Sequence, residues 1–178
     1  MDRLVYERFG SRIGFVRYLK YWLLAKIGSF RKHTLGQPDK NRRLVFICNG
    51  NICRSPVAEA YAKSLGREAA SCGFGCADGF PADNRAIQFA ESLGLSLHRH
   101  KTRNIVNFEF YDSDFIVVME PSHLKLFYEH FERNQSVVLA GNYCINPNPY
   151  IHDPYNCCDP FFYRCECRVV EAVRGICG

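Results

Sequence analysis

One short segment holds the side chains that could do chemistry in this chain. It reads Cys48-Asn49-Gly50-Asn51-Ile52-Cys53-Arg54-Ser55-Pro56 and begins with a thiol that could act as a nucleophile. Gly50 and the asparagines tolerate unusual backbone angles, so the segment could curl and turn successive N–H groups inward to bind an anion. Arg54 would add a planar, always charged group that grips two phosphate oxygens. The pattern predicts transfer of a phosphoryl group to sulfur.

The flanking residues place this segment between a strand and a helix. Residues 44–48 form a continuous apolar run, which is typical of a strand buried on both faces. Pro56 suits the first turn of a helix that we expect over 57–65. The positive end of that helix would stabilise a thiolate at Cys48 and lower the pKa of the thiol from about 8.5 to roughly 3.5–7.5.

Strand-like and helical segments alternate along the rest of the chain. We expect further strands over 69–73, 114–119 and 136–140, and helices over 83–93, 121–133 and 159–173. The alternation predicts an α/β fold, a four-stranded parallel sheet with helices on both faces. The phosphate-binding loop would follow the first strand of this sheet.

Charge divides the chain into two parts. Residues 1–43 hold 11 Lys/Arg and 3 Asp/Glu, a net charge of +8, whereas residues 44–178 hold 12 and 15, a net charge of −3. We therefore expect a basic helical extension with a linker over 1–43 and a catalytic domain over 44–178. Because the positive excess belongs to the extension, the average charge gives no ground for nucleic-acid binding.

The extension contains one amphipathic helical pattern. Apolar residues fall on one predicted helical face at Phe15, Tyr18, Leu19, Trp22, Leu23, Ile27 and Phe30. This face could pack on the catalytic domain or on a second subunit, or residues 12–31 could rest on an anionic membrane surface. No apolar run in 1–43 exceeds five residues, too short for a signal peptide or a spanning helix. We therefore expect a cytoplasmic protein with mostly reduced cysteines, which could also contact a membrane peripherally.

The cysteine segment resembles the signature of the low-molecular-weight protein tyrosine phosphatases, C-x-G-N-x-C-R-S-P, and matches all its fixed positions. The resemblance extends from Leu44 to the C-terminus, as in bacterial members, with residues 1–43 as an N-terminal extension. It includes Pro81-Ala82-Asp83 before a helix, His100 with Arg103, Met119 at a strand end, and Asp153-Pro154-Tyr155.

The resemblance implies a role for each matching residue. Cys48 would attack phosphorus, Arg54 would hold the phosphate, and Asp153 would protonate the departing phenolate. The phosphate-binding residues would be Asn49, Gly50, Asn51, Ile52, Cys53, Arg54 and Ser55. Ser55 would also donate a hydrogen bond to the thiolate. Asn51 and His100 would brace the loop, and Tyr155 would form an aromatic wall for a phenyl ring.

Asp159 competes with Asp153 for the role of the acid, because each precedes a proline. Asp159 leads into a helical stretch and is explained as its N-cap, whereas Asp153 sits in a loop with no helix to cap. In the family the partner at Cys53 can form a disulfide with the nucleophile, although a buried thiol explains Cys53 equally well. Cys157 and Cys158 could be redox-active or could simply pack. No His/Cys cluster has zinc spacing, so we expect no metal and no cofactor.

The substrate implied by the resemblance is a phosphotyrosine protein. The loop 74–80 has no tryptophan and looks like that of bacterial members paired with tyrosine kinases in capsule or exopolysaccharide production. One alternative is an arsenate reductase on the same fold, but Met119-Glu120-Pro121 stands where its redox cysteine pair belongs. The other is a phosphotyrosine-binding module without turnover, against which Cys48, Arg54 and Asp153 argue. The sequence assigns no oligomeric state.

Overall fold

The computed structural model describes residues 2–131 and 137–178. A parallel sheet of four strands, in the order β2-β1-β3-β4, forms its centre. The strands are β1 (Leu44–Cys48), β2 (Ala69–Gly73), β3 (Phe115–Val118) and β4 (Val137–Leu139). The predicted four-stranded parallel sheet is therefore confirmed, and its first two strands have the predicted bounds. β3 is one residue shorter at each end than predicted, and residue 136 lies outside the described part.

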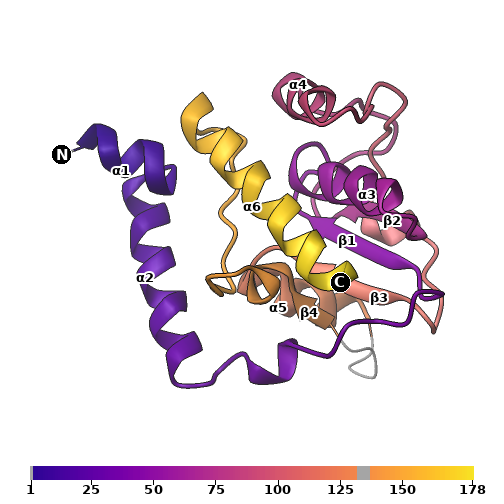
Figure 1. The fold of residues 1–178 in the computed structure, drawn as a ribbon, viewed down its shortest axis with the longest axis horizontal. Coiled ribbons are helices and arrows are strands. Elements are labelled where there is room, and N and C mark those ends of the chain that lie inside the picture. Colours follow the sequence, from indigo (N-terminus) through magenta and orange to yellow (C-terminus); the bar gives the residue numbers. More distant parts are fainter. Residues whose placement is uncertain (1, 132–136) are drawn as a thin grey trace.

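Six α-helices and three short 3-10 helices precede, connect or follow these strands in the described part of the chain. The helices are α1 (Asp2–Phe9), α2 (Arg12–Lys26), α3 (Arg54–Ser64), α4 (Asn84–Ser92), α5 (Pro121–His130) and α6 (Asp159–Cys177). The 3-10 helices are Arg31–His33, Ile105–Asn107 and Ala140–Tyr143. α3 and α6 lie together over one side of the sheet, while α1 and α2 stand at the outer edge beyond α6 (Figure 1).

The period of two along β1 gives the domain two apolar cores, one on each face of the sheet. Leu44, Phe46 and Cys48 belong to the core shared with α3, α4 and α6. Val45 and Ile47 belong to the core on the opposite face, which includes residues of α5. All five residues of β1 are buried, so the continuous apolar run is explained by helices on both faces.

Helix ends differ from the predictions by a few residues. α3 begins at Arg54 rather than at residue 57, and α6 continues to Cys177 rather than to residue 173. α5 ends at His130 because Phe131 has extended angles (φ −131°, ψ 154°). The last two residues of the helix predicted over 121–133 lie outside the described residues. The predicted linker spans 32–43; its first two residues belong to the 3-10 helix Arg31–His33, and residues 34–43 contain no regular helix or strand.

The extension packs through only part of the predicted face, since Tyr18 lines a cavity beside Tyr150 and Phe30 packs on an apolar core. Gly14 is buried and Tyr21 packs on Tyr150 with ring centroids 5.2 Å apart, whereas Leu19, Trp22, Leu23 and Ile27 are exposed. The reason is steric. A side-chain carbon at Gly14 would lie 2.1 Å from the Phe9 carbonyl of α1 and 3.2 Å from the His152 ring, so this glycine lets α2 lie close to both α1 and the domain. The sequence pattern predicts no separate helix over residues 2–9, where the structure has α1. The Phe9 ring of α1 lies against that of Phe15 in α2. No helix of the described part is long and apolar enough to cross a membrane.

Candidate active site

The loop after β1 curls around the sulfur of Cys48. Asn51 has a positive φ of 50° and donates its backbone N–H to Sγ of Cys48 at 3.2 Å. Phe74 and Gly75 donate their N–H groups to the carbonyls of Cys48 (3.1 Å) and Asn49 (2.9 Å). The left-handed backbone conformation occurs at Asn51 and not at Gly50. An asparagine tolerates this conformation when its side chain forms local hydrogen bonds.

The side chain of Asn51 bonds in three directions behind the loop. Its Nδ2 donates to Oγ of Ser55 and Oγ of Ser71, each at 2.9 Å, and its Oδ1 accepts the N–H of Arg103 at 2.9 Å. Burial lowers the pKa of His100, and its Nε2 donates to the Asn51 carbonyl at 2.7 Å. Asn51 and His100, which were predicted to brace the loop, therefore both form hydrogen bonds that hold it.

Cys48 is buried, and its sulfur lies 3.1 Å from Oγ of Ser55. Burial raises the pKa of the Cys48 thiol, and this outweighs the charge of Arg54 and the hydrogen bonds of Ser55, which act to lower it. The predicted lowering of the Cys48 pKa is therefore wrong for this structure. The physical reason is that burial disfavours the charged thiolate more strongly than Arg54 and Ser55 favour it, while the Asp153 carboxylate adds to the rise.

Arg54 is buried and holds the groups around it in place. Its Nη1 donates to Oε1 of Glu120 at 2.8 Å and to the carbonyl of Ile151 at 2.9 Å. Its Nη2 lies 2.8 Å from Oδ2 of Asp153. The fold thus brings Asp153 to the loop that carries Cys48 and Arg54, although Asp153 lies 99 residues after Arg54 in the sequence.

The two competing aspartates occupy different places. Oδ1 of Asp153 accepts the N–H of Tyr155 at 3.2 Å, and the Tyr155 side chain is half exposed. Asp159 points to solvent and lies 3.6 Å from Arg85. The N-cap assignment for Asp159 is wrong by one residue, because Cys158 is the N-cap and Asp159 begins α6.

Glu120 and His123 belong to the site but were missed as functional residues. Burial acts to raise the pKa of Glu120, but Arg54 and His123 outweigh it and hold that pKa below its usual range. Burial lowers the pKa of His123 to about 4, and its ring packs on Phe74 at 5.2 Å. A signal was available, since Glu120 follows β3 at the carboxyl edge of the sheet, where ligands bind in such folds.

All ten cysteines are free thiols in the structure. Burial raises the pKa of Cys53, which lies in the same apolar core as Cys48. Sγ of Cys157 is 3.5 Å from the carbonyl of Asp153, while Cys158 is exposed. The described residues contain no group of three or more side chains suited to a metal ion.

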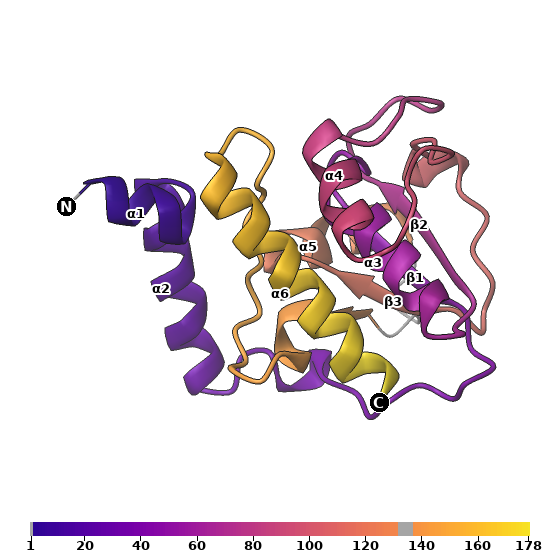
Figure 2. The same ribbon diagram turned by 45° about the horizontal axis from the view of Figure 1, so that its top comes forward.

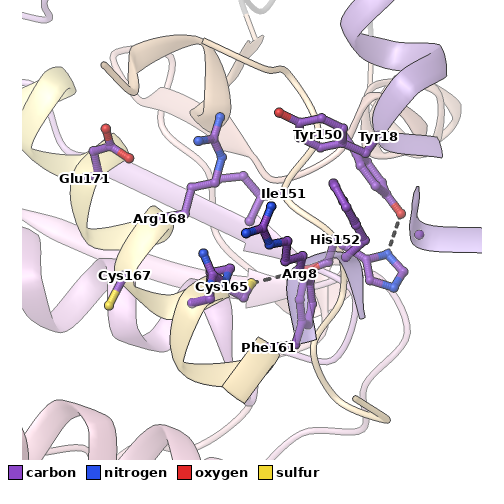
Figure 3. A pocket seen from close by; sticks show the side chains of 13 residues that line it. Arg8, Tyr18, Tyr150, Ile151, His152, Phe161, Cys165, Cys167, Arg168 and Glu171 are labelled. Atoms are coloured by element: carbon purple, nitrogen blue, oxygen red, sulfur yellow. Dashed lines mark hydrogen bonds between the residues drawn. The ribbon is translucent and has the colours of Figure 1, made fainter. Parts of the chain in front are cut away.

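A cavity of about 570 Å³ lies between the extension and α6. Tyr150, Ile151 and His152, the three residues before Asp153, form part of its wall, together with Tyr18 of α2. Figure 3 shows the rings of Tyr18, Tyr150 and His152 gathered on one side of it. The extension therefore reaches the segment that carries Asp153.

Fold and site together define an α/β protein whose first strand leads through a curled loop into the N-terminus of α3. The family model of the low molecular weight phosphotyrosine protein phosphatases matches residues 43–177. The chain belongs to that family and is a protein-tyrosine-phosphatase.

Individual relatives agree with this assignment. The probable low molecular weight protein-tyrosine-phosphatase AmsI of Erwinia amylovora is 33% identical over 114 residues, covering 63% of this chain and 78% of the relative. The low molecular weight protein-tyrosine-phosphatase Wzb of Escherichia coli is 36% identical over 113 residues, covering 60% and 77%. The crystal structure of the Erwinia amylovora tyrosine phosphatase amsI matches with a TM-score of 0.69 at 29% identity, covering 80% and 95%.

Proposed function

We propose that the protein hydrolyses phosphotyrosine in protein substrates through a phosphocysteine on Cys48. The observation that carries this proposal is the convergence of three groups: the Cys48 sulfur inside the curled loop, the Arg54 guanidinium, and the Asp153 carboxyl 2.8 Å from Nη2 of Arg54. A nucleophile, a cation for the phosphate and an acid for the leaving group are the three parts that such chemistry needs.

The first step would transfer the phosphoryl group to sulfur. The Cys48 thiolate attacks phosphorus, the bond from phosphorus to the phenolic oxygen breaks, and Asp153 gives its proton to that oxygen. The incoming phosphate oxygens would replace Asp153 at Nη2 of Arg54, which frees the carboxyl to reach the leaving group. Loop N–H groups and Arg54 stabilise the charge on the transferring oxygens.

The second step would return the enzyme to its starting state. Asp153 takes a proton from a water molecule, the oxygen attacks phosphorus, and the bond from phosphorus to sulfur breaks, which releases inorganic phosphate and the thiolate. Glu120 would keep Arg54 oriented throughout, because it holds Nη1 and leaves Nη2 for the substrate. Asn49, Gly50, Ile52 and Cys53 would complete the phosphate-binding loop.

Hydrolysis of p-nitrophenyl phosphate by wild type, Cys48→Ser and Asp153→Ala, without added metal, tests this proposal. We expect turnover by wild type, none by Cys48→Ser, and a kcat lowered by about 10²–10⁴-fold in Asp153→Ala. Asp159→Ala is the matched control and should keep wild-type activity. Equal activity in all four proteins would contradict the roles proposed for Cys48 and Asp153. Thiol-dependent arsenate reduction by wild type would favour the arsenate reductase alternative.

The substrate and setting of the reaction follow from the same proposal. The protein substrate would be a bacterial tyrosine kinase of capsule or exopolysaccharide production, in the cytoplasm, and residues 12–31 would allow peripheral contact with a membrane. Cys53 would protect an oxidised Cys48 by forming a disulfide with it. The phosphorylation state of the kinase in cells with and without the phosphatase tests the partner.

A further inference from the structure

The outer face of α2 carries an exposed apolar stripe. Ile13, Val16, Leu23 and Ile27 are 65, 63, 58 and 79% exposed. At 100° per residue these four positions all fall within an arc of about 80° on the helix, so they form one stripe. Figure 2 shows α2 at the edge of the molecule, with α1 packed at one end. Exposed apolar surface of this kind marks an interaction site in soluble proteins.

The charge around the stripe identifies the kind of partner. From Arg8 to Pro38 the chain has seven Lys or Arg and no Asp or Glu. Lys20 lies within the stripe and Lys26 beside it, where Lys26 also covers the Trp22 ring at 5.5 Å. A second copy of the chain would bring the same cations against these, and the two would repel. An anionic lipid surface complements both the cations and the apolar residues.

We propose that the outer face of α2 docks on an anionic lipid surface. The helix would lie in the plane of the interface, with the apolar stripe in the boundary between headgroups and acyl chains. Lys20 and Lys26 would reach the phosphate groups, since long basic side chains can bury their stems and keep the charge at the surface. Trp22, at the side of the stripe, would sit at headgroup level, where tryptophan is favoured.

The inner face of the same helix connects this surface to the active site. Gly14 lies against His152, and Tyr21 packs on Tyr150 at 5.2 Å. Arg17 also hydrogen-bonds Tyr150. His152 directly precedes Asp153, so a docked α2 would hold the site at a fixed place relative to the lipid. This consequence rests on the proposed function. With that function, the docked enzyme would act on phosphotyrosine of proteins close to the membrane.

Trp22 gives a direct measure of docking, because it is the only tryptophan of the chain. The full chain is titrated with vesicles of phosphatidylcholine containing phosphatidylglycerol, and with vesicles of phosphatidylcholine alone. We expect a blue shift of the emission and co-sedimentation with the anionic vesicles, binding at least 10-fold weaker to neutral ones, and weakening at high salt.

Two pairs of substitutions separate lipid docking from a general change in the protein. Leu23→Ser with Ile27→Ser removes half of the stripe and should weaken binding by more than 10-fold. Val106→Ser with Ile145→Ser is the matched control, since these residues are 70 and 86% exposed outside the extension, and it should bind like wild type. A further variant, Lys20→Gln with Lys26→Gln, should bind about 30-fold more weakly at low salt, because each lysine contributes about 1 kcal/mol.

Failure of lipid docking can be distinguished from failure of the proposed catalytic function. All variants should hydrolyse p-nitrophenyl phosphate like wild type without vesicles, so loss of docking and loss of catalysis are measured separately. Equal vesicle binding by the stripe pair and the control pair would overturn the proposal, as would no binding to anionic vesicles. Dimerisation that the stripe substitutions abolish, without lipid binding, would assign the face to a second copy instead.

Discussion

Glu166 should make the stability of the fold depend on pH. This residue of α6 is completely buried, and neither of its carboxyl oxygens has a hydrogen-bond partner among the described residues. Burial raises the pKa of Glu166 from 4.5 to about 8, with Arg54 opposing the shift and Asp153 adding to it. The folded protein therefore keeps a proton that the unfolded chain loses above pH 4.5.

The sign and size of the effect follow from linkage. Because the unfolded state binds fewer protons between pH 4.5 and about 8, the free energy of unfolding falls as pH rises through this window. One pH unit corresponds to about 1.4 kcal/mol, so Glu166 would lower the stability by about 3 kcal/mol at pH 7 and by about 5 kcal/mol above pH 8. Relaxation around the carboxylate would reduce these values.

Urea unfolding of Glu166→Gln from pH 5 to pH 8, with reductant, tests this reasoning. The amide carries no titrating proton, so the variant should lose less stability than wild type as pH rises, by about 3 kcal/mol over that window. A pH-independent change in the free energy of unfolding caused by the buried amide does not alter the slope of stability against pH. Glu109→Gln, at an exposed position, should follow the wild-type slope. Parallel pH profiles for wild type and Glu166→Gln would refute the account of the buried carboxyl.

Three other substitutions probe the active site. Asn51→Ala removes three hydrogen bonds, two of them buried, and places alanine at a φ of 50°, so it should lower the free energy of unfolding by about 3 kcal/mol in urea. An unchanged midpoint would contradict this. Glu120→Gln keeps an acceptor for Arg54 but loses the charge, and kcat/KM for p-nitrophenyl phosphate should fall on the order of 10–100-fold, while Ser122→Ala should change little. Tyr155→Ala should raise KM for aryl phosphates several-fold, whereas Tyr163→Ala, on α6, should not.

The sheet and the loop could be predicted because their signals are local. The apolar run of β1 and the alternation of strands and helices determine the parallel sheet, and the cysteine segment carries its own turn and helix start. The Glu120 contact with Arg54 could not be predicted from local pattern, because it joins positions 66 residues apart. From the sequence alone, Glu120 is explained as a residue at the start of a helix. Its contact with Arg54 depends on the pairing of β3 with β1.

The extension shows where periodicity misleads. The residues between Phe15 and Phe30 have a helical apolar pattern, and the structure contains that helix, but the side that packs is chosen by Gly14 and Tyr21. A glycine that permits close approach contributes no apolar signal, so the predicted face coincides only in part with the packed one. The raised pKa of Cys48 was missed for a related reason, because burial of the thiol dominates it and that burial depends on segments packed around the loop from elsewhere in the chain.

The most direct test of the central claim is detection of the phosphocysteine. Wild type and Asp153→Ala are mixed with p-nitrophenyl phosphate, quenched within milliseconds in acid, digested and analysed by mass spectrometry, with Cys48→Ser as the control. The account predicts one phosphoryl group on the peptide that contains Cys48, with none in the Cys48→Ser protein. Turnover with no labelled cysteine, or a phosphoryl group on a different residue, would contradict it.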